Sequence, residues 1–244
     1  MKKKEIFFVM LFMVSILSIK AQDYTHKWYV KGGLGIGFGL NHVDLKRTYT
    51  DQNGTGELVY GLDPGSTIAP SLSIGKNIYE NLSGQLTLVY NINYTYEAQY
   101  SSQSEPVEIS HGFSRFGIML EGNYYLTIIE DKWALVPTVG LGIFIPGDLF
   151  LKTPFYEQVV SYSAAPSAKI GMELQKSWKG KWSIGFGGFY QVENYKAKSV
   201  RYGELSDQDP NIQNLNASNF GIMVNIVFPI VQNTKMGHMK NVFK

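Results

Sequence analysis

Apolar and polar residues alternate along most of this chain, and the run Leu82–Tyr96 shows the alternation most fully. Its even positions carry leucine, tyrosine and isoleucine, apart from Gly84, whereas its odd positions carry mostly serine, glutamine, threonine and asparagine. Because side chains alternate across a strand, the run has one apolar face and one polar face. A tilted strand of about 9–11 residues crosses a bilayer, so this stretch predicts a strand long enough to span a membrane.

The same period of two recurs in seven other runs, and together they predict eight strands. The predicted strands are Trp28–Leu40, Thr67–Lys76, Leu82–Tyr96, Gly112–Thr127, Trp133–Ile145, Tyr162–Gln175, Trp182–Glu193 and Asn219–Phe228. Their connections alternate strictly, beginning and ending with a long one. Outer-membrane barrels have short periplasmic turns at one end and long external loops at the other. We therefore predict an all-β fold, an eight-stranded antiparallel up-and-down transmembrane β-barrel.

The polar faces of these strands indicate which side points outward. They carry Ser, Thr, Asn, Gln, Gly and a few charges, which is too polar for the dry core of a soluble barrel. We expect the apolar faces to be free of Lys, Arg, Asp and Glu, because a Lys or Arg facing lipid near the midplane costs about 2–4 kcal/mol. The apolar face is therefore predicted to meet lipid, and the polar face to fill a narrow interior.

Glycines and prolines modify this picture. The glycines of Trp28–Leu40 weaken a strand but leave room for bulky neighbours across a narrow interior. Their spacing does not match the G-x-G-x-x-G fingerprint and no helix pattern follows, so we expect no nucleotide site. Pro70 and Pro166 lie near strand starts, whereas Pro137 lies inside a predicted strand and predicts a bulge or a strand boundary.

Aromatic residues gather near both ends of the predicted strands, where amphipathic rings favour the two membrane interfaces. At the short-turn end we expect an interface belt that contains all four tryptophans of the chain. At the long-loop end we expect a second belt that includes two tyrosines. The predicted belt residues are Trp28, Trp133, Trp178, Trp182, Tyr94 and Tyr96.

The N-terminus has the pattern of an export signal: a basic start, an apolar run from Ile6 to Ile19, and a small residue, Ala21. We expect cleavage after Ala21, a barrel domain over 22–228 and a short periplasmic tail over 229–244. The whole chain has a net charge of +2, and the predicted signal removes four lysines and one glutamate, which leaves about −1. A net charge near −1 argues against nucleic-acid binding, which needs a basic surface. There is no cysteine, hence neither a lipoprotein anchor nor a disulfide.

Six charged residues fall on the predicted inner faces. We expect three of them toward the periplasmic half (Lys31, Glu121, Glu173) and three toward the external half (Arg115, Lys169, Glu193). Buried opposite charges must pair or stay hydrated. The interior is therefore predicted to be a polar plug rather than a pore.

With these features the chain resembles the small eight-stranded outer-membrane barrels, namely the OmpX-like group and the transmembrane domain of OmpA-like proteins. The resemblance covers 28–228, and Asn219–Phe228 looks like the C-terminal signal that such barrels present to the barrel assembly machinery. It implies the outer membrane of a Gram-negative bacterium, with outer-membrane lipid and that machinery as partners. PorT-like barrels of the gliding-type secretion system are similar in size and pattern, which implies a secretion-system or other external protein partner as the alternative.

Enzymatic activity is the least favoured interpretation. His111 and Ser114 lie near the top of the fourth predicted strand and His42 near the top of the first, and lipid A-modifying barrels use a histidine and a serine near the external rim. The segment His111–Ser114 does not match the lipid A deacylase motif. We therefore expect no catalytic, cofactor or metal site, and a structural or loop-mediated binding or adhesion role.

Overall fold

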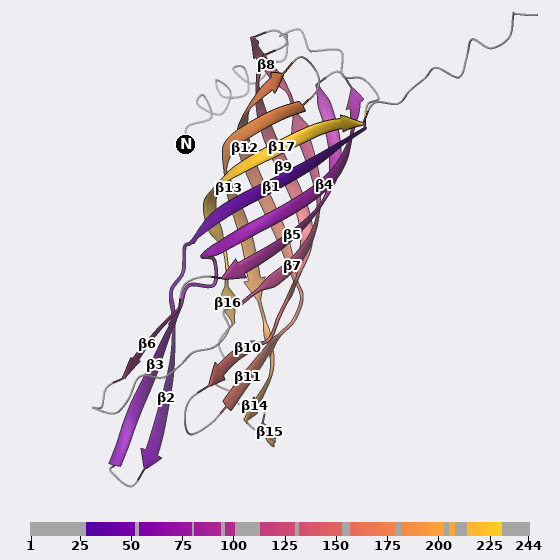
Figure 1. Cartoon of the computed structure of the whole chain (residues 1–244). Helices are drawn as coiled ribbons and strands as arrows, with labels where there is room; N and C mark the ends of the chain where they lie inside the picture. The colour runs from indigo at the N-terminus through magenta and orange to yellow at the C-terminus, as the bar shows by residue number, and fades with distance from the viewer. Residues whose placement is uncertain are drawn as a thin grey trace, which may run out of the picture.

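A closed barrel of eight antiparallel strands forms the centre of the molecule (Figure 1). The structure, a computed structural model, describes residues 28–51, 54–79, 81–93, 96–100, 113–129, 132–152, 157–178, 182–202, 205–207 and 214–230. The barrel strands are β1 (Trp28–Gly39), β4 (Thr67–Tyr79), β5 (Leu82–Asn93), β7 (Arg115–Tyr124), β9 (Trp133–Pro146), β12 (Ala165–Trp178), β13 (Trp182–Tyr195) and β17 (Asn219–Ile230). The predicted fold class and all eight predicted strands are confirmed, with ends that move by a few residues.

Each barrel strand pairs with the next barrel strand along the chain, and β17 closes the barrel against β1. In that closing pair Trp28 lies opposite Ile230 and Gly39 lies opposite Asn219. The start of β1, the end of β17 and the short turns therefore share one end. Among the described residues, no helix is long and apolar enough to cross a membrane.

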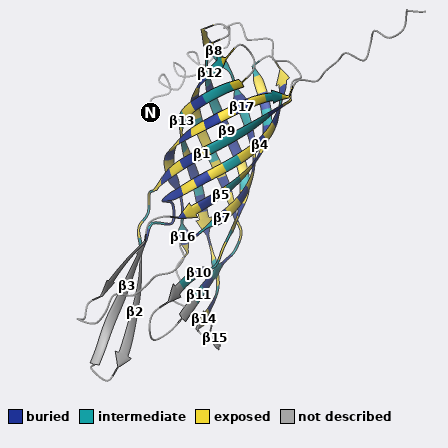
Figure 2. Ribbon diagram, in the orientation of Figure 1, coloured by how far each residue is buried: buried dark blue, intermediate teal, exposed yellow. Residues whose placement is uncertain are grey.

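Burial alternates along the barrel strands as the sequence pattern predicts (Figure 2). In β7, Leu120 is 68% exposed, whereas its neighbours Met119 and Glu121 are 1% and 3% exposed. Large apolar side chains cover the outside of all eight strands, and asparagine, glutamine, serine, threonine and charged residues fill the inside. The polar face is therefore the inner face.

Glycines on the inner face make room for large side chains on neighbouring strands, as expected. A Cβ atom on Gly75 would lie 2.3 Å from the ring of Tyr29, its partner in the β1–β4 pair. A Cβ atom on Gly117 would likewise lie 2.3 Å from the ring of Phe144, its partner in the β7–β9 pair. These close approaches let a narrow barrel hold two buried rings.

Pro137 corrects one prediction, because it marks neither a bulge nor a boundary within its own strand. It lies inside β9 and pairs with Met172 of β12. The interruption falls on the other neighbouring strand, where β7 ends at Tyr124 and β8 (Leu126–Ile129) continues along β9. A proline has no N–H for the ladder, and the gap lies where that donor is missing.

The long connections are not the polar loops that the sequence predicts. They form β2 (Val43–Asp51), β3 (Gly54–Leu62), β6 (Tyr96–Tyr100), β10 (Leu149–Lys152), β11 (Glu157–Tyr162), β14 (Ala197–Tyr202), β15 (Leu205–Asp207) and β16 (Leu215–Asn216). One sheet joins β2, β3 and β6, and another joins β10, β11, β14 and β15. Both lie beyond the barrel end opposite β8 (Figure 1). The dipeptide Asn53-Gly54, where β2 turns into β3, is a strong hairpin signal. In retrospect, this signal identifies the sheet of β2, β3 and β6.

The four tryptophans lie at the short-turn end of their strands. The rings of Trp178 and Trp182 stack with centroids 4.4 Å apart, and Trp28 is also exposed on the outside. At the other end, β5 stops at Asn93 and Tyr96 begins β6, so Tyr96 belongs to the external sheet and not to the barrel wall. Tyr94, the predicted signal peptide 1–21 and the tail beyond Ile230 lie outside the described residues.

Candidate functional site

The structure brings the six charged residues of the inner faces together as three ion pairs. Each pair joins strands that are not neighbours, so each crosses part of the barrel interior. The pairs are Lys31–Glu173 (2.7 Å), Lys169–Glu121 (2.8 Å) and Arg115–Glu193 (2.9 Å). Positive and negative groups therefore balance inside the barrel.

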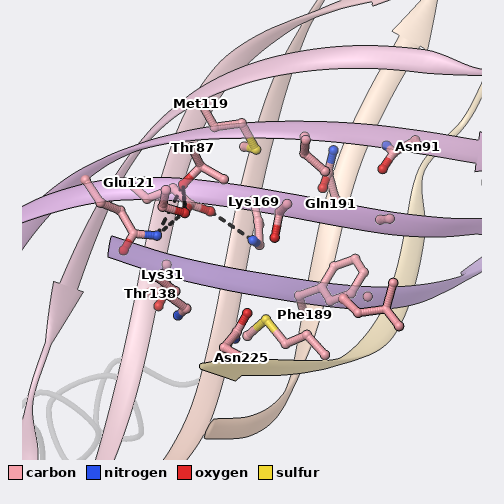
Figure 3. Close-up of a pocket in the computed structure, with 18 of the residues that line it drawn as sticks. Lys31, Thr87, Asn91, Met119, Glu121, Thr138, Lys169, Phe189, Gln191 and Asn225 are labelled. Carbon is pink, nitrogen blue, oxygen red and sulfur yellow. Dashed lines mark hydrogen bonds and ion pairs between the residues drawn. The ribbon is translucent and has the colours of Figure 1, made fainter. Parts of the chain in front are cut away.

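Lys169 and Glu121 form the pair at the centre of the interior (Figure 3). The other carboxylate oxygen of Glu121 accepts hydrogen bonds from Gln85 Nε2 at 2.6 Å and from Thr87 Oγ1 at 2.5 Å. The sequence places Lys169 in the external half and Glu121 in the periplasmic half, but the tilt of the strands brings them level. Glu121 therefore accepts hydrogen bonds from two neutral side chains in addition to its ion pair with Lys169.

Lys31 and Glu173 form a second pair, in which Asn225 takes part. Asn225 Nδ2 donates to the same Glu173 oxygen that Lys31 contacts, at 2.7 Å. A Cβ atom on Gly185 would lie 1.6 Å from the other oxygen of Glu173. The carboxylate therefore lies directly against the β13 backbone, and glycine is required there.

Arg115 and Glu193 form the third pair, and both side chains are completely buried. Glu193 also accepts hydrogen bonds from Gln191 and Tyr195. The Arg115 guanidinium donates to the carbonyl of Pro64 and lies 5.9 Å from the ring centroid of Tyr195. This pair thus links the barrel wall to a turn in the first long connection.

That turn, Asp63–Ser66, folds over the external mouth of the barrel. Asn93 Nδ2 donates to the carbonyl oxygens of Asp63 at 2.6 Å and Ser66 at 3.0 Å. A Cβ atom on Gly65 would lie 2.5 Å from the carbonyl oxygen of Ser218, the residue before β17. The turn is therefore held against both the barrel rim and the last long connection.

An apolar cluster completes this closure, and we call the cluster and the turn the external cap. The cluster comprises Leu62, Phe113, Met119, Phe144, Leu149, Val160, Tyr162, Ala165, Tyr195, Val200, Leu215 and Ala217. The ring of Phe113 packs edge-on against Tyr162 and Tyr195, with centroids 5.4 Å and 5.2 Å apart. Burial raises the pKa of the Tyr162 hydroxyl above its usual range. Sequence reasoning missed the cap, because its residues come singly from the external ends of barrel strands and from the long connections.

The periplasmic end of the interior holds a network of neutral polar groups. The Tyr29 hydroxyl lies 3.0 Å from both Ser83 Oγ and Gln85 Oε1. Asn123 Nδ2 donates to Gln85 Oε1 at 3.1 Å, and Thr138 Oγ1 donates to Asn123 Oδ1 at 2.8 Å. These groups fill the barrel between the central ion pairs and the short turns.

A cavity of about 50 Å³ lies between the central ion pairs and the cap (Figure 3). Lys31, Lys169, Glu121, Gln191 and Asn225 are among the residues that line it. A buried water needs about 10–15 Å³ of such space and two to four polar partners. The cavity can therefore hold a few water molecules, but not a channel of bulk water.

The candidate catalytic residues are not brought together in the described part of the chain. His111 lies outside the described residues. His42 Nδ1 lies 2.5 Å from Asp63 Oδ1 at the exposed edge of the cap. Ser114 contributes its carbonyl, which accepts a hydrogen bond from the Gly147 N–H at 2.8 Å. Across the described ranges, no group of three His, Asp or Glu side chains could hold a metal ion.

Comparison with solved structures finds barrels of low sequence similarity. Neisserial surface protein A is 10% identical, with a TM-score of 0.45, over 82% of this chain and 96% of that protein. An outer membrane channel from Pseudomonas putida F1 is 8% identical, with a TM-score of 0.29, over 87% of this chain and 98% of the channel. No protein-family model and no curated protein matches the chain.

Proposed function

We propose that this chain is an integral outer-membrane β-barrel protein whose closed interior conducts nothing and whose external strands carry out its role, structurally or by binding a partner. One observation carries the proposal. The barrel has a continuous apolar exterior, while its interior is filled with paired charges and covered by the external cap.

The apolar exterior supports a lipid environment. Leu72, Leu120, Leu141 and Phe186 are more than half exposed on four different strands. A soluble monomer rarely exposes a contiguous apolar patch above a few hundred Å², and this surface runs around the whole barrel. Lipid tails cover such a surface at no cost, so the chain fits a bilayer.

The interior supports a closed barrel. The three ion pairs leave no described charged residue of the lumen unpaired, and the cavity beneath the cap holds only a few waters. Ions that cross the lumen would have to displace these pairs and the Asp63–Ser66 turn. The interior is therefore a structural plug.

The external sheets are the part of the molecule best placed to meet a partner. Strands β2, β3 and β6 and strands β10, β11, β14 and β15 extend past the barrel rim (Figure 1). The outer strands of such sheets leave backbone N–H and C=O groups open to pairing with another chain. Extensions mounted on a rigid scaffold are frequent sites of binding.

Fractionation and electrophoresis test the placement in the membrane. The chain should appear in the outer-membrane fraction and migrate differently before and after heating. Planar-bilayer recording should show no stable conductance. A heat-insensitive protein in the soluble fraction contradicts the membrane placement, and a large stable conductance contradicts the closed interior.

Purification in mild detergent tests the role of the external sheets. A stoichiometric protein partner that is lost on shortening the β2–β3 hairpin supports binding through these sheets, and identification of that partner as a secretion component favours the PorT-like alternative. A barrel that purifies alone favours a structural role.

We also propose that the chain has no catalytic activity. Deletion of the protein should leave the lipid A mass spectrum unchanged. A change in that spectrum that the intact chain restores, but a Ser114→Ala variant does not, would contradict this.

A further inference from the structure

Two lysines lie on the outer face of the barrel, where the sequence predicts none. Lys76 is the last residue of the predicted strand Thr67–Lys76, and Lys176 lies on β12, which runs further toward the short-turn end than predicted. Lys76 shares its face with Ile74 and Ile78, and Lys176 shares its face with Leu174 and Trp178, all four of which are exposed. The expectation that the outer faces carry no charge is therefore wrong at this end.

Each of these lysines lies over tryptophan. Lys76 is the register partner of Trp28, and its Nζ lies 5.5 Å from the centroid of that ring. Lys176 is the register partner of Trp133, with its Nζ 5.2 Å from that ring and 4.8 Å from the ring of Trp178. An ammonium over a tryptophan face is attracted by the ring. The rings thus hold both ammonium groups at the level of the aromatic belt.

The two positions differ from the charged groups of the interior. Each described interior Lys or Arg has a carboxylate partner within hydrogen-bond distance. Among the described residues, neither Lys76 nor Lys176 forms an ion pair with a carboxylate. A tryptophan face attracts an ammonium without neutralising its charge. No carboxylate of the described residues therefore neutralises either ammonium group, and both lie at the edge of the apolar surface.

The strand order places the two positions on opposite sides of the barrel. Going around the wall in either direction, the β1–β4 pair lies four strand pairs from the β9–β12 pair. A protein partner that docks on one side would reach one of them. Lipid surrounds the barrel, so the same headgroup chemistry reaches both.

We propose that Lys76 with Trp28, and Lys176 with Trp133 and Trp178, each bind the phosphodiester headgroup of an anionic glycerophospholipid in the periplasmic leaflet. This rests on the proposed function, because it needs the short-turn end to lie at that leaflet. The ammonium donates charge-assisted hydrogen bonds to the phosphate oxygens. The apolar residues next to each lysine along its strand, Ile74 and Leu174, lie where the acyl chains descend.

Native mass spectrometry of the detergent-purified full chain tests the proposal, with phosphatidylglycerol as the probe and phosphatidylethanolamine as its zwitterionic counterpart. The wild-type barrel should retain two phosphatidylglycerol molecules in preference to phosphatidylethanolamine. Lys76→Gln and Lys176→Gln should each remove one, with at least about tenfold weaker binding at the altered position, and the double variant should remove both. Lys176→Arg should keep the second lipid, because a guanidinium also binds phosphate.

Lys132→Gln is the matched control, because it removes an exposed lysine at the same end that lies on no described tryptophan ring. It should leave both lipids bound. Equal losses in Lys132→Gln and Lys176→Gln, or no preference for phosphatidylglycerol in the wild type, would overturn the two lipid positions. If the wild-type barrel gives either of these results but still shows heat-modifiable migration, only the lipid positions are overturned and the proposed function stands. A soluble, heat-insensitive wild-type chain would overturn both proposals.

Discussion

The interior of the barrel near the periplasmic end and the external cap are filled with opposite kinds of side chain. The first holds Tyr29, Gln85 and Asn123 in a hydrogen-bonded network next to the two lysine-containing ion pairs. The second holds Phe113, Leu149 and Leu215 in an apolar cluster. The hydrophobic core of the described residues therefore lies at one end of the barrel, where the ends of barrel strands meet the segments that connect them.

The difference follows from where the apolar side chains of each region can be buried. On the barrel strands one parity faces outward, so it takes the apolar residues and leaves the polar ones to the narrow interior. Beyond the rim there is water outside the chain, so apolar residues turn inward as in any soluble fold. The Arg115–Glu193 pair lies where the polar interior of the barrel meets the apolar cluster of the cap. Four predictions test this division, beginning with that pair.

Replacement of Arg115 by Met should have the largest effect. It leaves the Glu193 carboxylate buried without its cation and removes the donor to the Pro64 carbonyl. Breaking one partner of a buried pair costs about 3–5 kcal/mol, so the free energy of unfolding in urea, measured in lipid vesicles, should fall by that amount. The double variant Arg115→Met/Glu193→Gln should recover a large part of it. Equal stability of the single and double variants would show that the unpaired Glu193 carboxylate is not the cause of the loss.

Replacement of an inward glycine should have an intermediate effect at either end. Gly117→Ala in the cap region and Gly75→Ala at the periplasmic end each place a methyl group against a buried ring. Overpacking costs about 1–3 kcal/mol, measured by the same urea unfolding. Phe144→Leu should restore stability in the Gly117→Ala background. Gly32→Ala is the matched control, because a Cβ atom there meets nothing within 4 Å. A loss in the control as large as in the others would mean that contact with a buried ring does not cause the losses at Gly75 and Gly117.

Replacement of Lys169 by Met should cost less than replacement of Arg115. The Lys169 side chain is 17% exposed, whereas that of Arg115 is 0% exposed. Glu121 keeps its hydrogen bonds from Gln85 and Thr87, and the adjacent cavity can hydrate it. We expect a loss of about 1–3 kcal/mol in urea unfolding. A loss equal to that of Arg115→Met would contradict the contrast between a hydrated interior and a dry junction.

Replacement of Tyr195 by Phe should have the smallest effect. It keeps the ring in the apolar cluster and removes only the hydroxyl that donates to Glu193. Gln191 and Arg115 still contact that carboxylate, so we expect about 1 kcal/mol, detectable as a small shift of the urea midpoint. Tyr195→Leu removes the ring as well and should cost more; a reversed order would mean that the hydrogen bond outweighs the packing.

The sequence predicts the barrel well because a strand has a fixed period. Once the period-two runs are aligned with the alternating connections, each residue has an assigned side, and Lys31, Glu121 and Glu173 fall inside by parity alone. Their partners do not follow in this way. Lys169 and Glu121 meet only because tilted strands shift the levels of residues around the wall, and the shift depends on the pairing register. The sequence therefore identifies the charged residues of the polar plug, but which of them pair follows only from the register of the strands.

The external cap is harder to predict, because no periodicity connects its members. Leu62, Phe113 and Leu215 come from three different long connections. A single apolar residue in a polar segment gives no signal until the other segments are placed beside it. Lys176 was missed for a different reason, since the apolar pattern fades before β12 ends and the strand continues to Trp178. Lys76 lies at an apolar-face position of its predicted strand, where no charge was expected.

The position of the cap also constrains the order in which the molecule is completed. Ala217 belongs to the apolar cluster of the cap, and the carbonyl of Ser218 lies against Gly65 of the turn. Both residues immediately precede β17, and the Leu40 N–H donates to the Ser218 carbonyl at 3.1 Å. These residues reach their places only when the last strand of the chain has joined the first. Contacts between such distant segments form late in folding, because the loop between them must close first. Until β17 has joined β1, the cap therefore lacks its contacts with Ala217 and Ser218, so the cap and the barrel wall are completed together.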